Sequence, residues 1–307
     1  MMHRSRFALV LVLTFGCVAA PAHAHITSDR ESRALASLDA SIVARTRSAG
    51  LPDSSGWAGA NARGARRVSE QAAALRALSD AAARIDSTTA ERAWTAIEAA
   101  MRLQRPGGGF EFVEAPTDSI AGWRDAAVFL AELNRAIGAV MNSPLKHRFR
   151  WRWALLRPKL ERAMNGLAAV SPRLEAGAKR DPALLLTLAE SFLLADGHYH
   201  LEAYGAAGQR ALAAALALQT TDGRFRGATA DRQARCLDAI EALALYFPGP
   251  FLDRASARLA PHVEALGRTA NADALAARSL GIRAARLALP PPLPGASHQA
   301  TPALEPR

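Results

Sequence analysis

The stretch AALALQTTDGRF at 214–225 repeats AAMRLQRPGGGF at 99–110, with six of the twelve positions identical. The shared residues form the pattern Gln-x-x-x-Gly-x-Phe, at Gln104, Gly108 and Phe110 and again at Gln219, Gly223 and Phe225. Alanine and leucine favour helix before each glutamine, and glycine adopts the positive φ with which many helices end. The glutamine amide is available for backbone carbonyls that have no partner at the helix end. We therefore expect each copy to end one helix and to turn the chain into the next.

The similarity continues beyond the turn, where 118–133 aligns with 231–246. Aspartate and alanine recur there at spacings that keep to one face of a helix, with Asp118 matching Asp231 and Asp125 matching Asp238. The copies lie 115 residues apart, roughly twice the length of a helical hairpin with its connections. One diverged hairpin, within 147–196, fits between them. This spacing is typical of helical hairpins arranged in a ring or solenoid.

The rest of the chain is also predicted to be helical, because alanine and leucine dominate and no alternating strand pattern persists. The fold class is all-α. We expect an N-terminal helix and loop over 25–66, a helical repeat domain over 67–289 and a disordered proline-rich tail over 290–307. Helices are expected near 31–47, 67–84, 89–104, 119–141, 147–168, 183–195, 201–219, 231–246, 252–266 and 271–288.

The first 24 residues resemble an export signal, with arginines at positions 4 and 6, an apolar segment at 7–20 and small residues before a cut after Ala24. A cut after Ala22 is the alternative. We therefore expect a periplasmic or secreted protein. No later apolar run reaches the length of a transmembrane helix, so no stable span is expected after cleavage.

The formal net charge of +10 suits an anionic polysaccharide, lipopolysaccharide or phospholipid headgroups as partner, whereas nucleic acid is not expected in that compartment. After cleavage one cysteine, Cys236, remains. A single thiol excludes an intramolecular disulfide and Cys-rich zinc chemistry, and we expect it to be buried and structural. We predict no cofactor and no metal site.

The two Gln-x-x-x-Gly-x-Phe turns resemble the Gln/Trp repeat of α/α-toroid proteins, with phenylalanine in place of tryptophan. They are also similar to the Asp-Gly-Phe/Trp turns of toroidal glycosidases and polysaccharide lyases. The resemblance covers about 70 residues in two blocks, and it implies repeated helical hairpins in an α/α-toroid. A full ring of six hairpins needs about twelve helices and ten are predicted. An incomplete toroid is therefore the alternative.

The polar cluster DGHYHLEAY at 196–204 joins two predicted helices. In toroidal polysaccharide lyases a His or Tyr removes the proton α to a uronate carboxylate while Arg or Asn neutralises that carboxylate, so the resemblance implies a β-elimination site here. The candidate catalytic residues are His198, Tyr199, His200 and Tyr204, and Arg210 is a candidate for substrate binding. The alternatives are a helix-start loop whose side chains cap and pack, or metal binding by His198 and His200. A further alternative is copper binding by an amino-terminal His25.

Cations and aromatics alternate in KHRFRWRW at 146–153. Tryptophan stacks on sugar faces and arginine pairs with carboxylate or sulfate, so Arg148, Trp151, Arg152 and Trp153 form a candidate subsite for an anionic glycan. The alternatives are an amphipathic helix start whose tryptophans join the core, and a membrane-surface segment.

Glycoside hydrolysis would require two carboxylates at a defined separation. The repetition of Asp118 as Asp231 and of Asp125 as Asp238 favours structural roles instead, as helix caps and as partners of arginines. The first hypothesis is thus an exported toroid protein that acts on an acidic polysaccharide, by β-elimination if it is an enzyme. The second is a non-catalytic helical repeat protein that binds an envelope glycan or a protein. Convergence of His198, His200, Arg148 and the post-repeat loops on one cleft would favour the enzyme.

Overall fold

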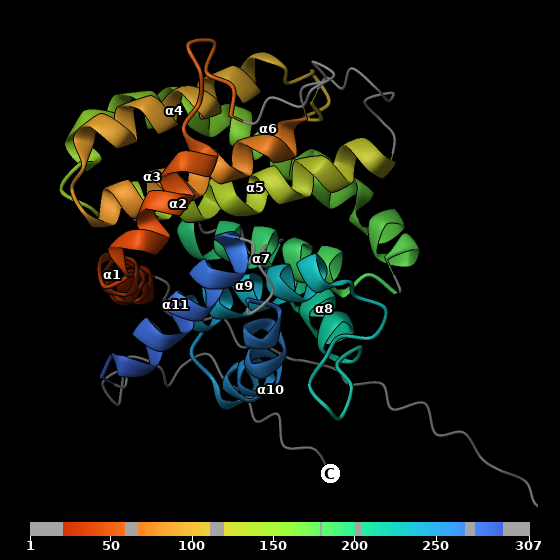
Figure 1. Ribbon diagram of the computed structural model, residues 1–307. Helices are drawn as coiled ribbons and strands as arrows, with labels where there is room; N and C mark the ends of the chain where they lie inside the picture. The colour runs from red at the N-terminus through yellow and green to blue at the C-terminus, as the bar shows by residue number, and fades with distance from the viewer. Residues whose placement is uncertain are drawn as a thin grey trace, which may run out of the picture.

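The computed structural model describes residues 21–58, 67–110, 120–178, 180–199, 204–267 and 274–290, without the side chains of 21–28, 198–199 and 267. This part of the chain is all-α and contains no strand (Figure 1). The elements are α1 (Pro21–Ala36), α2 (Ala40–Gly50), the 3-10 helix η1 (Val68–Gln71), α3 (Ala72–Ala83), α4 (Ser87–Arg102), α5 (Ile120–Met141), α6 (Lys146–Gly177), α7 (Pro182–Tyr199), α8 (Gly205–Leu216), α9 (Ala230–Tyr246), α10 (Pro250–Gly267) and α11 (Ala274–Ala288).

The observed helices follow the predicted ranges, with differences at their ends. The helix expected at 31–47 is two helices, because the chain breaks after Ala36 and the Asp39 carboxylate caps α2 by accepting from the Ser41 amide at 2.7 Å. α4 begins after Asp86, whose carboxylate accepts from the Thr89 amide at 3.0 Å. α9 begins after Thr229, so Asp231 lies in its first turn and is not the cap that the sequence predicts.

Helices α3, α5, α7, α9 and α11 pack against one another in chain order. Helices α4, α6, α8 and α10 each pack on the helix that precedes them and form the outer layer. Because each inner helix returns through an outer one, the inner helices run in the same direction. These inner helices form a ring that α1 and α2 complete. The ring has an N-terminal end, where the inner helices begin, and a C-terminal end, where they finish.

Helices α1 and α2 close the gap between α11 and α3. α2 packs on both of these helices, and α1, which Figure 1 views almost along its axis, also contacts α5 and α9. Leu35 and Leu38 pack with Leu194, Leu245 and Ile282 near the ends of α7, α9 and α11. This arrangement of helical hairpins is compatible with the predicted toroid or incomplete toroid.

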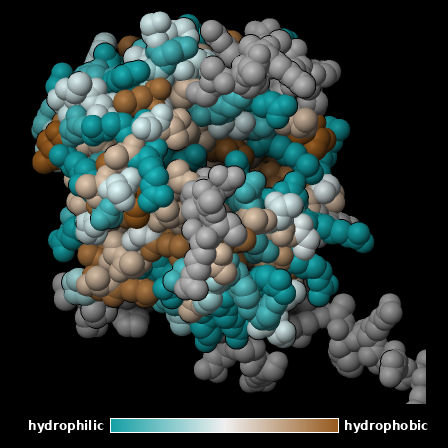
Figure 2. Space-filling model, viewed as in Figure 1, coloured by the Kyte–Doolittle hydropathy of each residue, from teal (hydrophilic) through white to brown (hydrophobic). Residues whose placement is uncertain are grey.

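One continuous apolar core lies between the inner and outer helices. Trp57, Trp94 and Trp123 are buried, as expected from the sequence. Hydrophilic residues cover much of the face that Figure 2 shows, with hydrophobic residues in smaller groups. No helix within the described residues is long and apolar enough to cross a membrane.

Both repeat turns dock onto the next outer helix. The Gln104 amide donates to the Lys159 carbonyl of α6 at 2.8 Å, and the Gln219 amide donates to the Ala255 carbonyl of α10 at 2.9 Å. The two turn glycines have φ of 89° and 95°, and a methyl group on either would lie 2.3 Å from a carbonyl of the same outer helix, at Arg162 or Arg258. The glutamine therefore joins the turn to the next outer helix, whereas the sequence predicts that it satisfies carbonyls at the end of its own helix.

A third turn of the same kind precedes η1 and α3. Its Gly56 amide donates to the Asp53 carbonyl at 3.0 Å, as the Gly108 amide does to Arg105 and the Gly223 amide to Thr220. Gly56 has a φ of 80°, and a methyl group there would lie 2.8 Å from the Thr95 carbonyl of α4. The segment 51–58, expected as part of a flexible or loop-like connection, is thus a docked turn.

Candidate functional site

The second repeat turn borders a surface hollow of about 480 Å³ at the N-terminal end of the ring. The turn and the start of α9 line it. The lining residues are Thr220, Thr221, Asp222, Arg224, Phe225, Arg226, Gly227, Ala228 and Gln233. This segment is where the second copy of the repeat differs from the first, with TTDGR in place of RPGGG before the shared phenylalanine.

Asp222 holds the rim of the hollow in one conformation. Its carboxylate accepts from the Thr220 hydroxyl at 2.5 Å and from the Arg224 guanidinium at 2.7 and 2.8 Å. The Thr220 hydroxyl, followed by the hydrogen bonds from Arg224, holds the pKa of Asp222 far below its ordinary value. Asp222 therefore stays ionised and engages Arg224 at any physiological pH.

Gln233 of α9 fixes the floor of the hollow. Its side-chain oxygen accepts from the Phe225 amide at 3.0 Å and its amide donates to the Phe225 carbonyl at 2.9 Å. Both bonds are buried, so Phe225 is held on both sides of its backbone. The next residue, Arg226, is exposed and has no ion-pair or side-chain hydrogen-bond partner within the described residues.

The connection between α6 and α7, with a second unpaired arginine, passes beside Gly227 of the turn. A methyl group on Gly227 would lie 3.6 Å from the Arg180 carbonyl, which places these two segments side by side. Arg180 is exposed, and none of the described residues forms an ion pair with it. Asp181, its neighbour, is engaged by Arg232 at 3.6 Å. Two guanidinium groups thus remain free for an anionic ligand.

The predicted His/Tyr cluster lies at the other end of the ring. His198 and Tyr199 are the last residues of α7, while their side chains, and His200 altogether, lie outside what is described. α7 has 18 residues, so its ends are about 27 Å apart at 1.5 Å per residue. The repeat turns lead into the N-terminal ends of α5 and α9. The backbone of His198 therefore lies at the opposite end of α7 from the second repeat turn, while the loop after the first repeat turn lies outside the described residues.

Tyr204 is described and buried. Its hydroxyl donates to the Asn165 amide oxygen of α6 at 2.6 Å, and its ring lies 5.8 Å from that of Phe192. Burial, and then the charge of Glu161, raises the pKa of Tyr204. Arg210 is exposed on α8, where its charge opposes the effect of burial on the pKa of Glu175. The catalytic role of Tyr204 stays a prediction, and the contacts observed here are those of a packed residue.

The predicted glycan subsite lies at the start of α6. Arg148 and Arg152 both pair with Glu91 of α4, at 3.4 and 2.6 Å. Trp153 is half-buried against the core, whereas Trp151 is 73% exposed. Trp151 and Asn165, the partner of Tyr204, are about 21 Å apart along α6. The two predicted sets of site residues are therefore separate.

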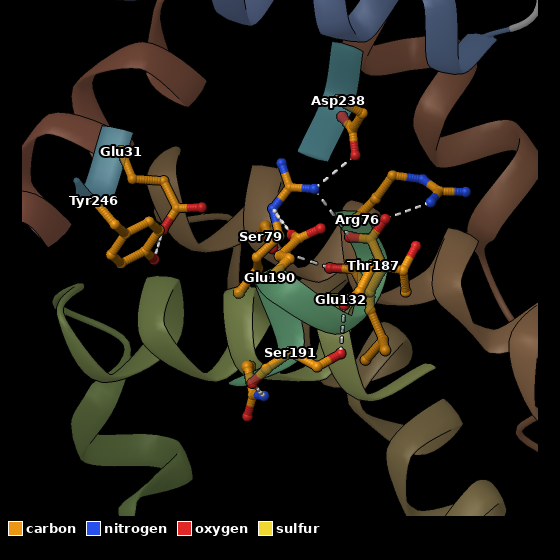
Figure 3. A network of polar contacts seen from close by, with 12 residues as sticks. Glu31, Arg76, Ser79, Glu132, Thr187, Glu190, Ser191, Asp238 and Tyr246 are labelled. Atoms are coloured by element: carbon orange, nitrogen blue, oxygen red, sulfur yellow. Dashed lines mark hydrogen bonds and ion pairs between the residues drawn. The ribbon is translucent and has the colours of Figure 1, made fainter. Parts of the chain in front are cut away.

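A network of charged side chains runs through the centre of the ring (Figure 3). Arg135 of α5 contacts Asp238 of α9 at 2.7 Å, Glu190 of α7 at 3.4 Å and Glu132 at 3.5 Å. Arg278 of α11 contacts Asp80 of α3 at 2.9 Å. Each of these six residues is at most 7% exposed. Arg76 pairs with Glu132 at 2.6 Å, and Glu31 of α1 is held by the Tyr246 hydroxyl.

The protonation of this network follows from burial and from the two arginines. Burial raises the pKa of Glu190 well above its ordinary value and also raises that of Glu31. Burial alone would raise the pKa of Asp238 as well, but Arg135 and Arg278 outweigh it and the pKa is lowered. A polymer cannot reach groups that are this deeply buried, so we assign the network to the assembly of the ring and not to ligand binding.

Of the repeated aspartates that are described, Asp238 alone has the predicted arginine partner, and Asp231 is not a helix cap. Asp238 pairs with Arg135 as stated, and Asp125 accepts from the Ser69 hydroxyl at 3.1 Å. Asp118 lies outside the described residues. Cys236 is a free, buried thiol, as expected.

Comparison with protein-family models and with curated proteins finds no match for this chain. Among the side chains that are described, no three His, Cys, Asp or Glu residues are placed to hold a metal ion. The candidate functional site therefore rests on geometry, and the candidate is the open hollow at the second repeat turn, with the exposed Arg226 in its lining.

Proposed function

We propose that this is an exported, non-catalytic helical repeat protein that binds an acidic polysaccharide at the hollow beside the second repeat turn. The observation that carries the proposal is Arg226, exposed and unpaired within the described residues, in the lining of an open hollow, with the backbone of the exposed Arg180 beside it at Gly227. A guanidinium group pairs bidentately with a carboxylate or sulfate, which makes a uronate or a sulfated sugar the fitting class of ligand.

The rigidity of the turn supports binding. Asp222 and Gln233 hold the backbone of Arg224 and Phe225 before Arg226, and Gln233 also donates to the Ala228 carbonyl after it at 3.4 Å, which lowers the conformational entropy lost when a ligand binds. Thr221 adds a hydroxyl group of the kind that hydrogen-bonds sugars, whereas the Thr220 hydroxyl is engaged by Asp222. The net charge of +10 favours the approach of a polyanion over the whole surface.

The absence of convergence between the His/Tyr cluster and the hollow favours binding without chemistry. An acid or base acts only within hydrogen-bonding reach of the proton that it transfers. The end of α7 and the second repeat turn lie at opposite ends of the ring, so a sugar bound in the hollow is far from His198.

The test compares polygalacturonate with a neutral glucan in titration calorimetry, using the wild type, Arg226→Ala and Arg150→Ala. Arg150 is an equally exposed arginine on α6. We expect binding of the polyuronate alone, weakened at least fivefold by Arg226→Ala and unchanged by Arg150→Ala, because loss of one charge-assisted contact costs about 1.5–3 kcal/mol.

Two outcomes would count against the proposal. Weakening by Arg150→Ala and not by Arg226→Ala would move the ligand to α6. Formation of an ultraviolet-absorbing unsaturated uronide during the titration would show β-elimination, and would direct attention to His198 and His200.

A further inference from the structure

The first half of α6 exposes large apolar side chains that the fold does not use. Trp151 is 73% exposed and Leu155 is 63% exposed. Residues four apart lie on one face of a helix, and Pro158, also exposed, continues the same line three residues later. The other four tryptophans are buried or half-buried. Trp151 thus stands apart from the rest of the tryptophans in this chain.

Basic side chains border this apolar line on both sides. At 100° per residue, Arg148, Arg152 and Lys159 lie about 60–100° from Trp151 on one side of the helix. On the other side Arg150, Arg157 and Lys146 lie about 100–140° from it, closer to the buried face. From Lys146 to Arg162 the segment has seven Lys or Arg residues and one acid, Glu161. The opposite face, with Phe149, Leu156 and Leu160, is buried in the core. The helix is therefore held in place while its outer face stays open.

An apolar line with cations on both flanks is the arrangement of a helix that lies in the plane of a bilayer surface. Tryptophan prefers the headgroup level, and each nearby Lys or Arg gains from the negative potential of anionic lipids. The same residues are less suited to a site that binds one uronate group specifically. Arg148 and Arg152 are already engaged by Glu91, so they are not free to pair bidentately with a uronate. An anionic bilayer attracts cations through its surface potential and does not require a free guanidinium group.

We propose that residues 146–162 of α6 form a docking surface for a bilayer that contains anionic phospholipid. Trp151 and Leu155 enter the headgroup region, and Lys146, Arg150 and Lys159, exposed and without ion-pair partners in the described chain, contact the lipid phosphates. The surface is distinct from the hollow at the second repeat turn and does not depend on the function proposed for it.

The experiment uses protein purified after export, with its N-terminus determined by mass spectrometry, because the apolar segment 7–20 would itself enter vesicles. Flotation with phosphatidylcholine vesicles is compared with flotation with vesicles that also contain phosphatidylglycerol. Tryptophan emission is recorded in parallel. We expect binding only to the anionic vesicles, reduced by high salt and accompanied by a blue shift, since Trp151 is the strongly exposed tryptophan.

The variant Trp151→Ala/Leu155→Ala should bind at least tenfold more weakly and lose the blue shift. Both residues are exposed, so the variant is expected to fold, which circular dichroism checks. Ile85→Ala removes an exposed apolar residue elsewhere and should bind like the wild type. The proposal is overturned if wild type and double variant bind alike, if no binding to anionic vesicles occurs at low salt, or if soluble polyuronate gives the blue shift and vesicles do not.

Discussion

Arg135 of α5 donates a hydrogen bond to Asp238 of α9 at 2.7 Å, across 103 residues of sequence. Helix α7 stands between these two helices in the packing order of the ring, so the bond ties non-adjacent members together. Glu190 of α7 lies on the same guanidinium. A single arginine thus joins three inner helices. Its buried charge is paired with carboxylates from helices that are distant in sequence.

Asp238→Ala is expected to destabilise the protein by about 3–5 kcal/mol, because it leaves the buried Arg135 with one strong partner fewer. Urea unfolding followed by circular dichroism measures the loss. Asp231→Ala, in the exposed first turn of the same helix, should cost less than about 1 kcal/mol. Equal unfolding midpoints for the two variants would show that the network contributes little.

Glu190→Gln is expected to gain stability relative to the wild type as the pH rises. Burial raises the folded-state pKa of Glu190. The contribution of its protonated carboxyl to the free energy of unfolding is therefore fully present below the ordinary pKa of about 4.3, and is lost as the pH rises toward the folded-state value. Glutamine does not ionise and avoids this loss. Urea unfolding between pH 5 and 8 tests it, with the half-exposed Glu98→Gln as a control that should show no trend. A difference that shrinks with pH would mean that Glu190 is ionised and stabilised by Arg135.

The hairpin repeat could be predicted because the chemistry of each turn is local. Glycine at a positive φ and a glutamine four residues earlier mark the two copies directly. The third turn escaped prediction because proline stands where the other copies have glutamine, and alanine where they have phenylalanine, although its backbone hydrogen bonds are the same. Backbone geometry is thus kept where the side-chain pattern is lost.

The full length of α6 was missed for a similar reason. Pro172 favours an end near 168, since proline leaves the carbonyl four residues earlier without a donor. The Ser171 hydroxyl supplies that donor, at 3.1 Å from the Ala168 carbonyl, and the helix continues to Gly177. At Pro172 a neighbouring hydroxyl thus takes the place of the missing N–H.

The network of buried charged side chains could not be predicted from a sequence pattern. Its members come from six helices and about fifty residues usually separate one from the next, so only the repeat match at Asp238 gave an indication. The position of the hollow is partly indicated by the sequence. It lies in the segment where the two copies differ, but only the structure places Arg180 beside Gly227.

Cys236 is expected to resist thiol reagents in the folded protein. Burial, and then the charge of Asp181, raises the pKa of its thiol, and the reactive thiolate is therefore scarce. At pH 8 Ellman's reagent, applied to a chain that begins at His25, should react only slightly with the native protein and fully, with one thiol per chain, in urea. Rapid reaction of the native protein would show that α9 opens locally.

Gly108→Ala is expected to cost about 1–3 kcal/mol, whereas Gly107→Ala should be nearly neutral. The two glycines are adjacent in the first repeat turn, yet a methyl group on Gly108 would lie 2.3 Å from the Arg162 carbonyl at a φ of 89°, and one on Gly107 meets nothing within 4 Å. Relieving the clash separates the turn from α6 and stretches the 2.8 Å bond from Gln104 to Lys159. Thermal and urea unfolding of both variants measure the difference. A similar loss in the two would mean that backbone flexibility of the turn, and not its docking on the outer helix, requires glycine at this position.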